Sequence, residues 1–327
     1  MTRSTLVTGA AGFIGSFVSQ RLLARGNAVV GLDNLNDYYD PNLKRARLTR
    51  LQGSPDFAFV EADIVDPAAI QRVFAQHSIE RVVHLAAQAG VRHSITHPQD
   101  YIDSNLTGFL NILQAVRARP VHHLVYASSS SVYGGNTKLP FSESDRVDRP
   151  VSLYAVTKRA NEMMAYVYSS QFGVPATGLR FFTVYGPWGR PDMATFIFTR
   201  AILAGQPIDV YNHGDMRRDF TYIDDIAEGV VRVLDRVPPN GADGVQHRVY
   251  NIGNHRSEPL LRFIDVLSGA LGRKAEMRFL PMQVGDVKET FADISDLSRE
   301  YGWSPTTRID EGLPRFVKWY GEYYGRQ

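Results

Sequence analysis

The sequence predicts an α/β protein built on a doubly wound parallel sheet, followed by a smaller α/β lobe that binds substrate. Short apolar runs alternate with helix-period segments through the first half of the chain, which is the pattern of a parallel sheet with crossover helices. The apolar runs are continuous, as is typical of strands that helices cover on both faces. After residue 181 this regular alternation loosens, which indicates a second, less regular lobe.

The expected elements follow one another with short connections. In the first part, strands are expected near 6–7, 28–32, 57–60, 81–85, 123–127 and 176–181, and helices near 12–25, 67–76, 99–118 and 152–172. In the second part, helices are expected near 192–204, 223–235, 257–271 and 309–323, and strands near 208–211, 248–252 and 276–280. We therefore expect a first lobe of residues 1–180 and a second of residues 181–327, interleaved with the first. Ligands should bind where the strands end.

Composition excludes several classes of protein. The chain has 327 residues, 44% hydrophobic and 21% charged, with 36 Lys and Arg against 34 Asp and Glu. This near-balance argues against nucleic acid as a partner. Since there is no Cys, a disulfide scaffold, a thiolate metal site and a cysteine nucleophile are excluded, and we expect no metal. No stretch approaches the ~18 apolar residues of a membrane span or resembles a signal peptide, so a cytoplasmic enzyme without a membrane partner is expected.

Three glycines lie between the first expected strand and the first expected helix. They are Gly9, Gly12 and Gly15, spaced G-x-x-G-x-x-G, with Phe13 and Ile14 inside the motif. Glycines there permit a tight turn and close approach to a pyrophosphate, and the helix N-terminus adds free N–H groups. The motif predicts a Rossmann-type dinucleotide site.

Asp33 selects the cofactor. It ends the second strand, 18 residues after Gly15, where a carboxylate accepts hydrogen bonds from ribose hydroxyls and repels a 2′-phosphate. The predicted cofactor is therefore NAD. Further cofactor-binding candidates follow the strands or lie in the next helix: Asn34, Asn36, Asp63, Ile64, Leu85, Ala86, Ala87, Gln88 and Asn105.

Tyr154 and Lys158 are predicted to be catalytic. Their four-residue spacing places both on one face of a helix. A phenol is a poor base at neutral pH, but a nearby ammonium and a positive nicotinamide would lower its pKa. A run of four serines, residues 128–131, follows the fifth strand, and chemistry alone does not choose among them. One hydroxyl there could bridge the phenolate and a substrate hydroxyl.

The glycine spacing and these residues resemble the extended branch of the short-chain dehydrogenase/reductases, in the NAD-dependent epimerase/dehydratase family. The resemblance makes Ser129 the catalytic serine, because it stands four positions before the tyrosine of Val132-Tyr133-Gly134. Sugar-nucleotide 4,6-dehydratases carry Asp-Glu next, and decarboxylating relatives usually keep a Glu. Ser130 and Ser131 stand there instead, so elimination lacks its acid and base.

The same resemblance assigns residues of the second lobe to a UDP-sugar. It implies that Phe182 packs near the nicotinamide and that Thr183 reaches the sugar–phosphate linkage. Arg218 would grip the diphosphate, Tyr211 would lie near the uracil, and Asp286 would hold the uridine ribose. One departure is Gln283, where many UDP-galactose 4-epimerases have an arginine; a different or weaker grip on the diphosphate is expected.

Two stretches resemble UDP-glucuronate 4-epimerases in particular. They are residues 32–44 and residues 189–194. Because the carboxylate of a uronic acid must be satisfied in a low-dielectric cleft, Arg190 is the candidate partner. Ser130, Ser131 and Thr183 would serve as neutral donors.

The expected activity is NAD-dependent C4 epimerisation of a UDP-sugar through a transient 4-keto intermediate, with UDP-glucuronate and UDP-galacturonate as the pair interconverted. The alternatives are a UDP-glucose or UDP-N-acetylglucosamine 4-epimerase, a UDP-sugar decarboxylase or dehydrogenase, and a non-catalytic NAD-binding regulator. The intact set of Ser129, Tyr154 and Lys158 argues against a regulator. The resemblance also implies a homodimer formed through a four-helix interface.

Overall fold

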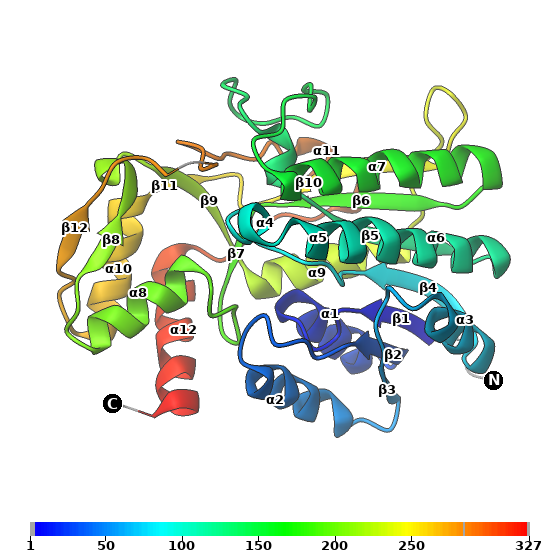
Figure 1. Cartoon of the computed structure of the whole chain (residues 1–327), viewed down its shortest axis with the longest axis horizontal. Coiled ribbons are helices and arrows are strands. Elements are labelled where there is room, and N and C mark those ends of the chain that lie inside the picture. Colours follow the sequence, from blue (N-terminus) through cyan, green and yellow to red (C-terminus); the bar gives the residue numbers. More distant parts are fainter. Residues whose placement is uncertain (1–3, 284, 326–327) are drawn as a thin grey trace.

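A central parallel sheet organises the molecule. The structure is a computed structural model that describes residues 4–283 and 285–325. Within these residues the sheet has seven strands in the order β10-β6-β5-β4-β1-β2-β3 (Figure 1). The strands are β1 (Ser4–Thr8), β2 (Ala28–Asp33), β3 (Phe57–Glu61), β4 (Ile79–His84), β5 (His123–Ser129), β6 (Ala176–Phe181) and β10 (His247–Ile252). The order reverses between β1 and β4, which opens a crevice at the carboxyl ends of these strands. This is the predicted Rossmann-type fold.

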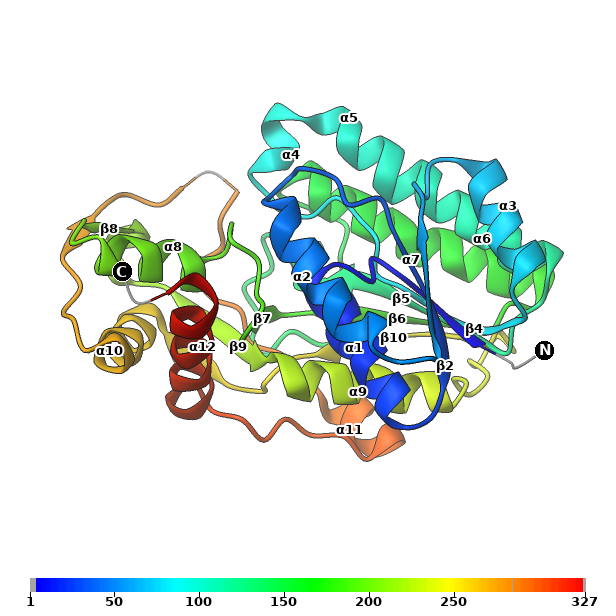
Figure 2. The same ribbon diagram turned by 90° about the horizontal axis from the view of Figure 1, so that it is seen from below.

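Helices cover both faces of the sheet, as the continuous apolar strands predict. One face carries α1 (Phe13–Ala24), α9 (Ile223–Asp235) and, beyond α1, α2 (Pro41–Gln52). The other carries α3 (Pro67–Gln76), α6 (Phe109–Ala118) and α7 (Leu153–Phe172). Figure 2 shows α1, α2 and α9 together on one side of the strands. Val18 and Val230 belong to the core of the first face, and Ile70 and Ile112 to that of the second.

The helix expected near 99–118 is divided into three parts. It consists of α5 (Pro98–Tyr101), a π-helical segment η1 (Ile102–Gly108) and α6, and a short helix α4 (His93–Thr96) precedes it. A π-helical segment releases backbone groups from the α-helical pattern. Here the carbonyl of Asn105, inside the π segment, accepts a hydrogen bond from Nδ2 of Asn161 at 2.6 Å. The segment is thereby tied to α7.

A second lobe lies beside the carboxyl ends of the strands (Figure 1). Its strands are β7 (Thr183–Tyr185), β8 (Ile208–Val210), β9 (Arg217–Tyr222), β11 (Ser257–Pro259) and β12 (Met277–Phe279). Its helices are α8 (Ala194–Leu203), α10 (Leu260–Leu271) and α12 (Ile309–Tyr324). Phe196, Phe263 and Phe316 lie in its own buried core.

The two lobes are interleaved in sequence. After β9 the chain returns to the first lobe, where α9 packs on α1 and β10 pairs with β6. Helix α11 (Ser295–Tyr301) then packs near β10 before the chain enters α12. The division at residues 180 and 181 stays a prediction, and the strand order requires that any such division be an interleaved one.

The sequence did not predict helices α2, α4 and α11 or strands β7 and β9, and β11 occupies the start of a segment that was expected to be helical. Helix α2 has clear start signals, because Asp40 accepts a hydrogen bond from the N–H of Asn42 at 2.9 Å and Pro41 is the first helical residue. Its buried face mixes three leucines with Lys44 and Arg47, so its apolar pattern is interrupted by charged residues. No helix among the described residues has the length and apolarity that a membrane span requires.

Candidate active site

A cavity of about 900 Å³ lies between the two lobes, at the carboxyl ends of the strands. Every site residue predicted from the sequence lines it, except Asn105. Around it lie Gly9, Gly12, Phe13, Ile14, Gly15, Asp33, Asn34, Asn36, Asp63, Ile64, Leu85, Ala86, Ala87, Gln88, Ser129, Ser130, Ser131, Tyr154, Lys158, Phe182, Thr183, Arg190, Tyr211, Arg218 and Asp286. The structure thus brings together residues from both lobes at one place.

The glycine turn between β1 and α1 is too crowded for side chains. A Cβ on Gly15 would lie 2.0 Å from the carbonyl oxygen of Gly9, and one on Gly9 would lie 2.8 Å from the amide nitrogen of Ala86. Gly9 also has a φ of 71°, which favours glycine. Helix α1 begins after Gly12 without a side-chain cap. Its first N–H groups are therefore available to a phosphate.

Asp33 stands at the end of β2 beside this turn. Its carboxylate accepts hydrogen bonds from the N–H of Ala11 at 3.1 Å and of Leu35 at 2.9 Å. Burial raises the pKa of Asp33 above its usual value, although these bonds and the charge of Lys44 oppose the rise. Next to it, Nδ2 of Asn34 donates to Asp63 at 2.9 Å. The polar groups at the ends of β2 and β3 thus form one wall of the cavity.

Asn105 supports the cavity from behind and does not line it. Its side-chain oxygen accepts from the N–H of Gln88 at 2.8 Å, and its Nδ2 donates to the carbonyl of Gln88 at 3.0 Å and to Thr157 at 3.0 Å. Both polar ends of its amide thus hold the nearby chain in place, while the assignment of Asn105 to the cofactor site stays a prediction. Asn105 fixes the segment after β4, which does line the cavity.

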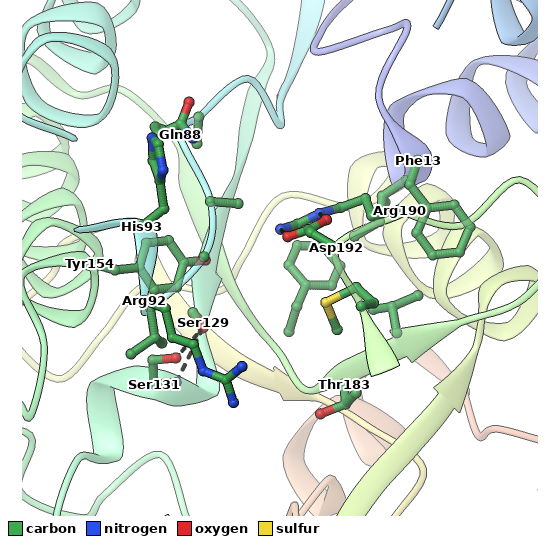
Figure 3. A pocket seen from close by; sticks show the side chains of 18 of the residues that line it. Phe13, Gln88, Arg92, His93, Ser129, Ser131, Tyr154, Thr183, Arg190 and Asp192 are labelled. Carbon is green, nitrogen blue, oxygen red and sulfur yellow. Dashed lines mark hydrogen bonds and ion pairs between the residues drawn. The ribbon is translucent and has the colours of Figure 1, made fainter. Parts of the chain in front are cut away.

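Tyr154, Ser129 and Lys158 converge from α7 and β5 (Figure 3 shows the first two). Burial raises the pKa of Tyr154 above its ordinary 10.0, while a hydrogen bond with Ser129 and the charge of Arg190 lower it. The Lys158 ammonium donates to the carbonyl of Ala127 at 3.0 Å and lies 6.0 Å from the centre of the Tyr154 ring. Burial lowers the pKa of Lys158 to about 8. In the chain by itself, burial outweighs the groups that lower the pKa of Tyr154, and a lowered pKa in the presence of the nicotinamide stays a prediction.

The four serines after β5 have different partners. Ser128 donates to Glu162 at 2.6 Å, so its hydroxyl is held by α7. Ser129 accepts from the N–H of Ser131 at 3.1 Å and donates to the Ser131 hydroxyl at 3.2 Å. The hydroxyls of Ser129 and Ser131 therefore face the same space, on the Tyr154 side of the cavity (Figure 3).

A buried ion pair supports α7 beneath Tyr154. Arg180 of β6 donates to both oxygens of Glu162, from Nε at 2.8 Å and from Nη2 at 2.9 Å. The side chains of Arg180 and Glu162 are 3% and 1% exposed. Because the hydroxyl of Ser128 joins this pair, it ties the end of β5 to the helix that carries Tyr154 and Lys158.

Arg190 faces the catalytic side chains from the second lobe. Its Nε donates to Oδ1 of Asp192 at 3.0 Å and its Nη2 donates to Oδ2. The hydroxyl of Tyr38 donates to the same carboxylate at 3.1 Å. Figure 3 shows the Arg190–Asp192 pair across the cavity from Tyr154, with Ser131 on the Tyr154 side. A cation therefore faces the hydroxyls of Ser129, Ser131 and Tyr154 across the cavity.

The residues assigned to the nucleotide line the same cavity. Asp286 pairs with Arg92 at 3.4 Å, and the Arg92 guanidinium lies 5.4 Å from the centre of the Tyr211 ring. Arg218 donates to the carbonyl of Lys288 at 3.0 Å. Burial lowers its pKa, opposed by the charges of Asp286 and Glu289.

Sequence reasoning did not single out many of the residues that line the cavity, among them Tyr38, Asp192 and Arg92. A signal for the first two existed, because they lie within the two stretches that carried the resemblance. Their importance depends on a contact across 154 residues of chain, which no local pattern shows. The described residues contain no group of three or more His, Cys, Asp or Glu side chains that could hold a metal ion.

Comparisons with known proteins agree on one family. Residues 5–253 match the NAD dependent epimerase/dehydratase family. The chain is 50% identical to UDP-glucuronate 4-epimerase 3 of Arabidopsis thaliana, over 98% of this chain and 77% of that protein. It is 48% identical to Protein CapI of Staphylococcus aureus, over 98% of both. A solved structure of UDP-glucuronic acid 4-epimerase from Bacillus cereus, in complex with UDP-glucuronic acid and NAD, is similar at a TM-score of 0.91 and 34% identity, covering 98% of this chain and 100% of that one.

Proposed function

The chain belongs to the NAD dependent epimerase/dehydratase family, and from this premise we propose that it is an NAD-dependent isomerase that interconverts UDP-glucuronate and UDP-galacturonate. The observation that carries the proposal is the arrangement of one cavity: Tyr154 and Ser129 on one side face Arg190 on the other. Tyr154 and Ser129 supply a base for a sugar hydroxyl. Arg190 supplies a cation for a sugar carboxylate.

The residues at the sheet edge fit NAD. The uncapped start of α1 suits the pyrophosphate, and the glycine turn has no space that side chains could fill. The carboxylate of Asp33 suits ribose hydroxyls and excludes a 2′-phosphate. When bound, NAD+ would supply the acceptor for the hydride of C4, and the NADH so formed would supply the hydride that returns to C4. The cofactor is therefore not consumed.

Tyr154 is the base in this proposal. It takes the proton of the C4 hydroxyl and returns it later, while Ser129 holds the sugar oxygen and the phenol in one hydrogen-bonded line. Lys158 donates to the Ala127 carbonyl, next to Ser128 and Ser129, and so fixes the end of β5 against α7. The result of the first half-reaction is a transient 4-keto sugar. With Ser130 and Ser131 in place of an acid and a base, elimination does not compete.

The sugar must turn over between the two half-reactions, and its carboxylate needs a partner throughout. A 4-keto uronic acid is a β-keto acid, which loses CO₂ when its carboxylate bond is perpendicular to the keto plane. Arg190 can hold the carboxylate by a charge-assisted bond, with Thr183, Ser130 and Ser131 as neutral donors around it. Phe182 would pack near the nicotinamide, while Tyr211, Arg218 and Asp286 would hold the UDP part.

One observation favours UDP-glucose as a second substrate. Asp192 neutralises the charge of Arg190, so a sugar with a neutral CH₂OH group would not leave an unpaired cation. The test compares kcat/KM for UDP-glucuronate and UDP-glucose in the wild type and in Arg190→Ala, with an assay for pentose products. The proposal expects a roughly ten- to hundred-fold selective loss on UDP-glucuronate. Equal losses on both sugars, or a wild type that prefers UDP-glucose outright, would overturn the uronate assignment.

We also propose that the protein is a cytoplasmic homodimer. Helix α7 exposes Val156, Met163 and Val167, whose spacing puts them on one face of the helix. Paired with the same face of a second copy, this stripe would be covered. Light scattering should give twice the mass of 36.6 kDa, and Met163→Glu should give the monomer.

A further inference from the structure

Arg47 on α2 is a fully buried arginine that bonds only to neutral groups. Its exposed fraction is 0%. Nε and Nη2 both donate to the carbonyl of Trp188, at 3.0 and 2.6 Å, and Nη2 also donates to the carbonyl of Gly189 at 2.9 Å. Nη1 donates to the carbonyl of Ala11 at 3.0 Å and to the Tyr39 hydroxyl at 2.6 Å. Among the described residues no carboxylate forms an ion pair with it.

A buried charge without an anionic partner is costly unless hydrogen bonds satisfy all its donors. A lysine could not replace Arg47. The donors of a guanidinium lie on three separate nitrogens and reach acceptors in different directions, whereas the donors of an ammonium all lie on one nitrogen. Two of the segments that Arg47 joins belong to the cavity: the glycine turn at Ala11 and the loop that precedes Arg190. The arrangement thus fixes one side of the cavity relative to the other.

The loop before Arg190 has a backbone conformation that is unfavourable without stabilising contacts. Trp188 has a φ of 62°, a left-handed conformation that residues with a side chain rarely adopt. Its carbonyl is the one that receives two bonds from Arg47. Because Arg190 comes two residues later, the direction of its side chain depends on this turn.

A second contact from the same part of the chain reaches Arg190 through Asp192. The Tyr38 hydroxyl donates to Asp192, and its pKa is raised to about 12 by burial and by that carboxylate, so it remains protonated at neutral pH. Asp192 in turn occupies the Nε and Nη2 side of the Arg190 guanidinium. The Tyr38 hydroxyl also contacts the Arg190 guanidinium itself.

We propose that Arg47 and Tyr38 are positioning residues that aim the Arg190 guanidinium at the substrate carboxylate, Arg47 through the backbone at 188–189 and Tyr38 through Asp192. The inference rests on the proposed function and deepens it. It gives a physical reason why the stretch after Asp33 resembles enzymes that act on uronates. The loop and helix that follow β2 hold Arg190, the residue proposed to bind the sugar carboxylate.

The test measures the ratio of kcat/KM for UDP-glucuronate to that for UDP-glucose. The variants are Arg47→Lys, Tyr38→Phe, Arg190→Ala and the doubles of the first two with Arg190→Ala. Arg45→Met, which removes a charge from an exposed position of the same helix, is the matched control. Arg47→Lys should lower the ratio roughly ten- to hundred-fold, because a small misplacement of a binding group has effects of this size. Tyr38→Phe should lower it less, and Arg45→Met should leave it unchanged.

Non-additivity separates positioning from a general structural role. If both residues act through Arg190, neither change should lower the ratio further in the Arg190→Ala background. A wild-type ratio in both single variants, or a further loss in the doubles, would overturn the inference. If Arg47→Lys does not fold, Tyr38→Phe is judged by the same two criteria.

The proposed function can fail separately. A wild type that does not convert UDP-glucuronate would overturn that function, and calorimetric binding of UDP-glucuronate and UDP-glucose to the same variants would then decide the inference. A wild type that binds both nucleotides equally, or a binding preference that survives Arg47→Lys and Tyr38→Phe, would contradict it.

Discussion

The ammonium of Lys158 lies 6.0 Å from the centre of the Tyr154 ring and donates its hydrogen bond to the Ala127 carbonyl. The two residues share a face of α7, and the ammonium is hydrogen-bonded to the end of β5. In the chain by itself the pKa of Tyr154 is raised by burial, and Ser129 and Arg190 are the groups that lower it. The base is thus tuned by residues from both lobes.

Removing the phenol oxygen tests the role of Tyr154. Tyr154→Phe should lower kcat by ~10²–10⁴-fold, the usual contribution of general acid–base catalysis. Bound NAD should be retained, because the glycine turn and Asp33 are untouched. Steady-state kinetics and cofactor extraction check both parts. Near-normal turnover would show that another group is the base.

The pH profile tests the electrostatic link between Arg190 and Tyr154. The base acts when deprotonated, so kcat/KM should rise with pH up to the pKa of Tyr154. Because the Arg190 charge lowers that pKa, Arg190→Ala should raise it and move the rising limb to higher pH. UDP-glucose is the substrate to use, since it has no carboxylate, and Arg190→Lys is the control that keeps the charge. If the rising part of the kcat/KM profile stayed in place or moved to lower pH in Arg190→Ala, the electrostatic link between Arg190 and Tyr154 would be contradicted.

Cofactor choice is expected to depend on Asp33. Denaturing extraction of the purified protein should release NAD(H) and little NADP(H), because the carboxylate repels a 2′-phosphate. Asp33→Asn should weaken this discrimination. A preparation that carries mostly NADP would refute the assignment.

The buried pair beneath the site predicts a loss of stability. Glu162→Gln leaves the Arg180 charge buried without its partner and should cost about 3–5 kcal/mol of unfolding free energy. The pKa of Glu162 is lowered by Arg180, so this stabilisation is present above its usual pKa of 4.5 and is lost as the pH falls below it. Arg159→Met removes the exposed partner of the same carboxylate and should cost under about 1 kcal/mol. Denaturant unfolding at neutral pH compares the variants; equal effects would show that the Arg180 bond is not the important one.

Local patterns were enough to predict the sheet and the cofactor turn. The strands are continuous apolar runs, and the glycines occupy positions where a Cβ would collide with backbone. Strand β9 was missed because it begins with Arg217, Arg218 and Asp219, which do not look like a buried strand. The structure buries Asp219 by giving its carboxylate the N–H groups of Asn254 and Ala292, at 2.5 and 3.1 Å.

The partners of the site residues could not be predicted locally. Ser128 bonds with Glu162, 34 residues away, and Tyr38 with Asp192, 154 residues away. Asn105 was expected to hold the nearby chain, but that its amide would bond with the backbone of Gln88 could not be read from the sequence. The residue types that face a ligand can be read from a sequence, whereas the groups that hold them depend on how distant segments pack.

The central claim is tested most directly by the fate of the hydrogen at C4. The purified protein is incubated with UDP-glucuronate in D₂O without added cofactor, and the products are identified by NMR. The account predicts UDP-galacturonate whose C4 carries the original hydrogen, because the hydrogen removed from C4 is the one that returns. Deuterium at C4, a pentose as the main product, or no conversion of UDP-glucuronate would contradict it.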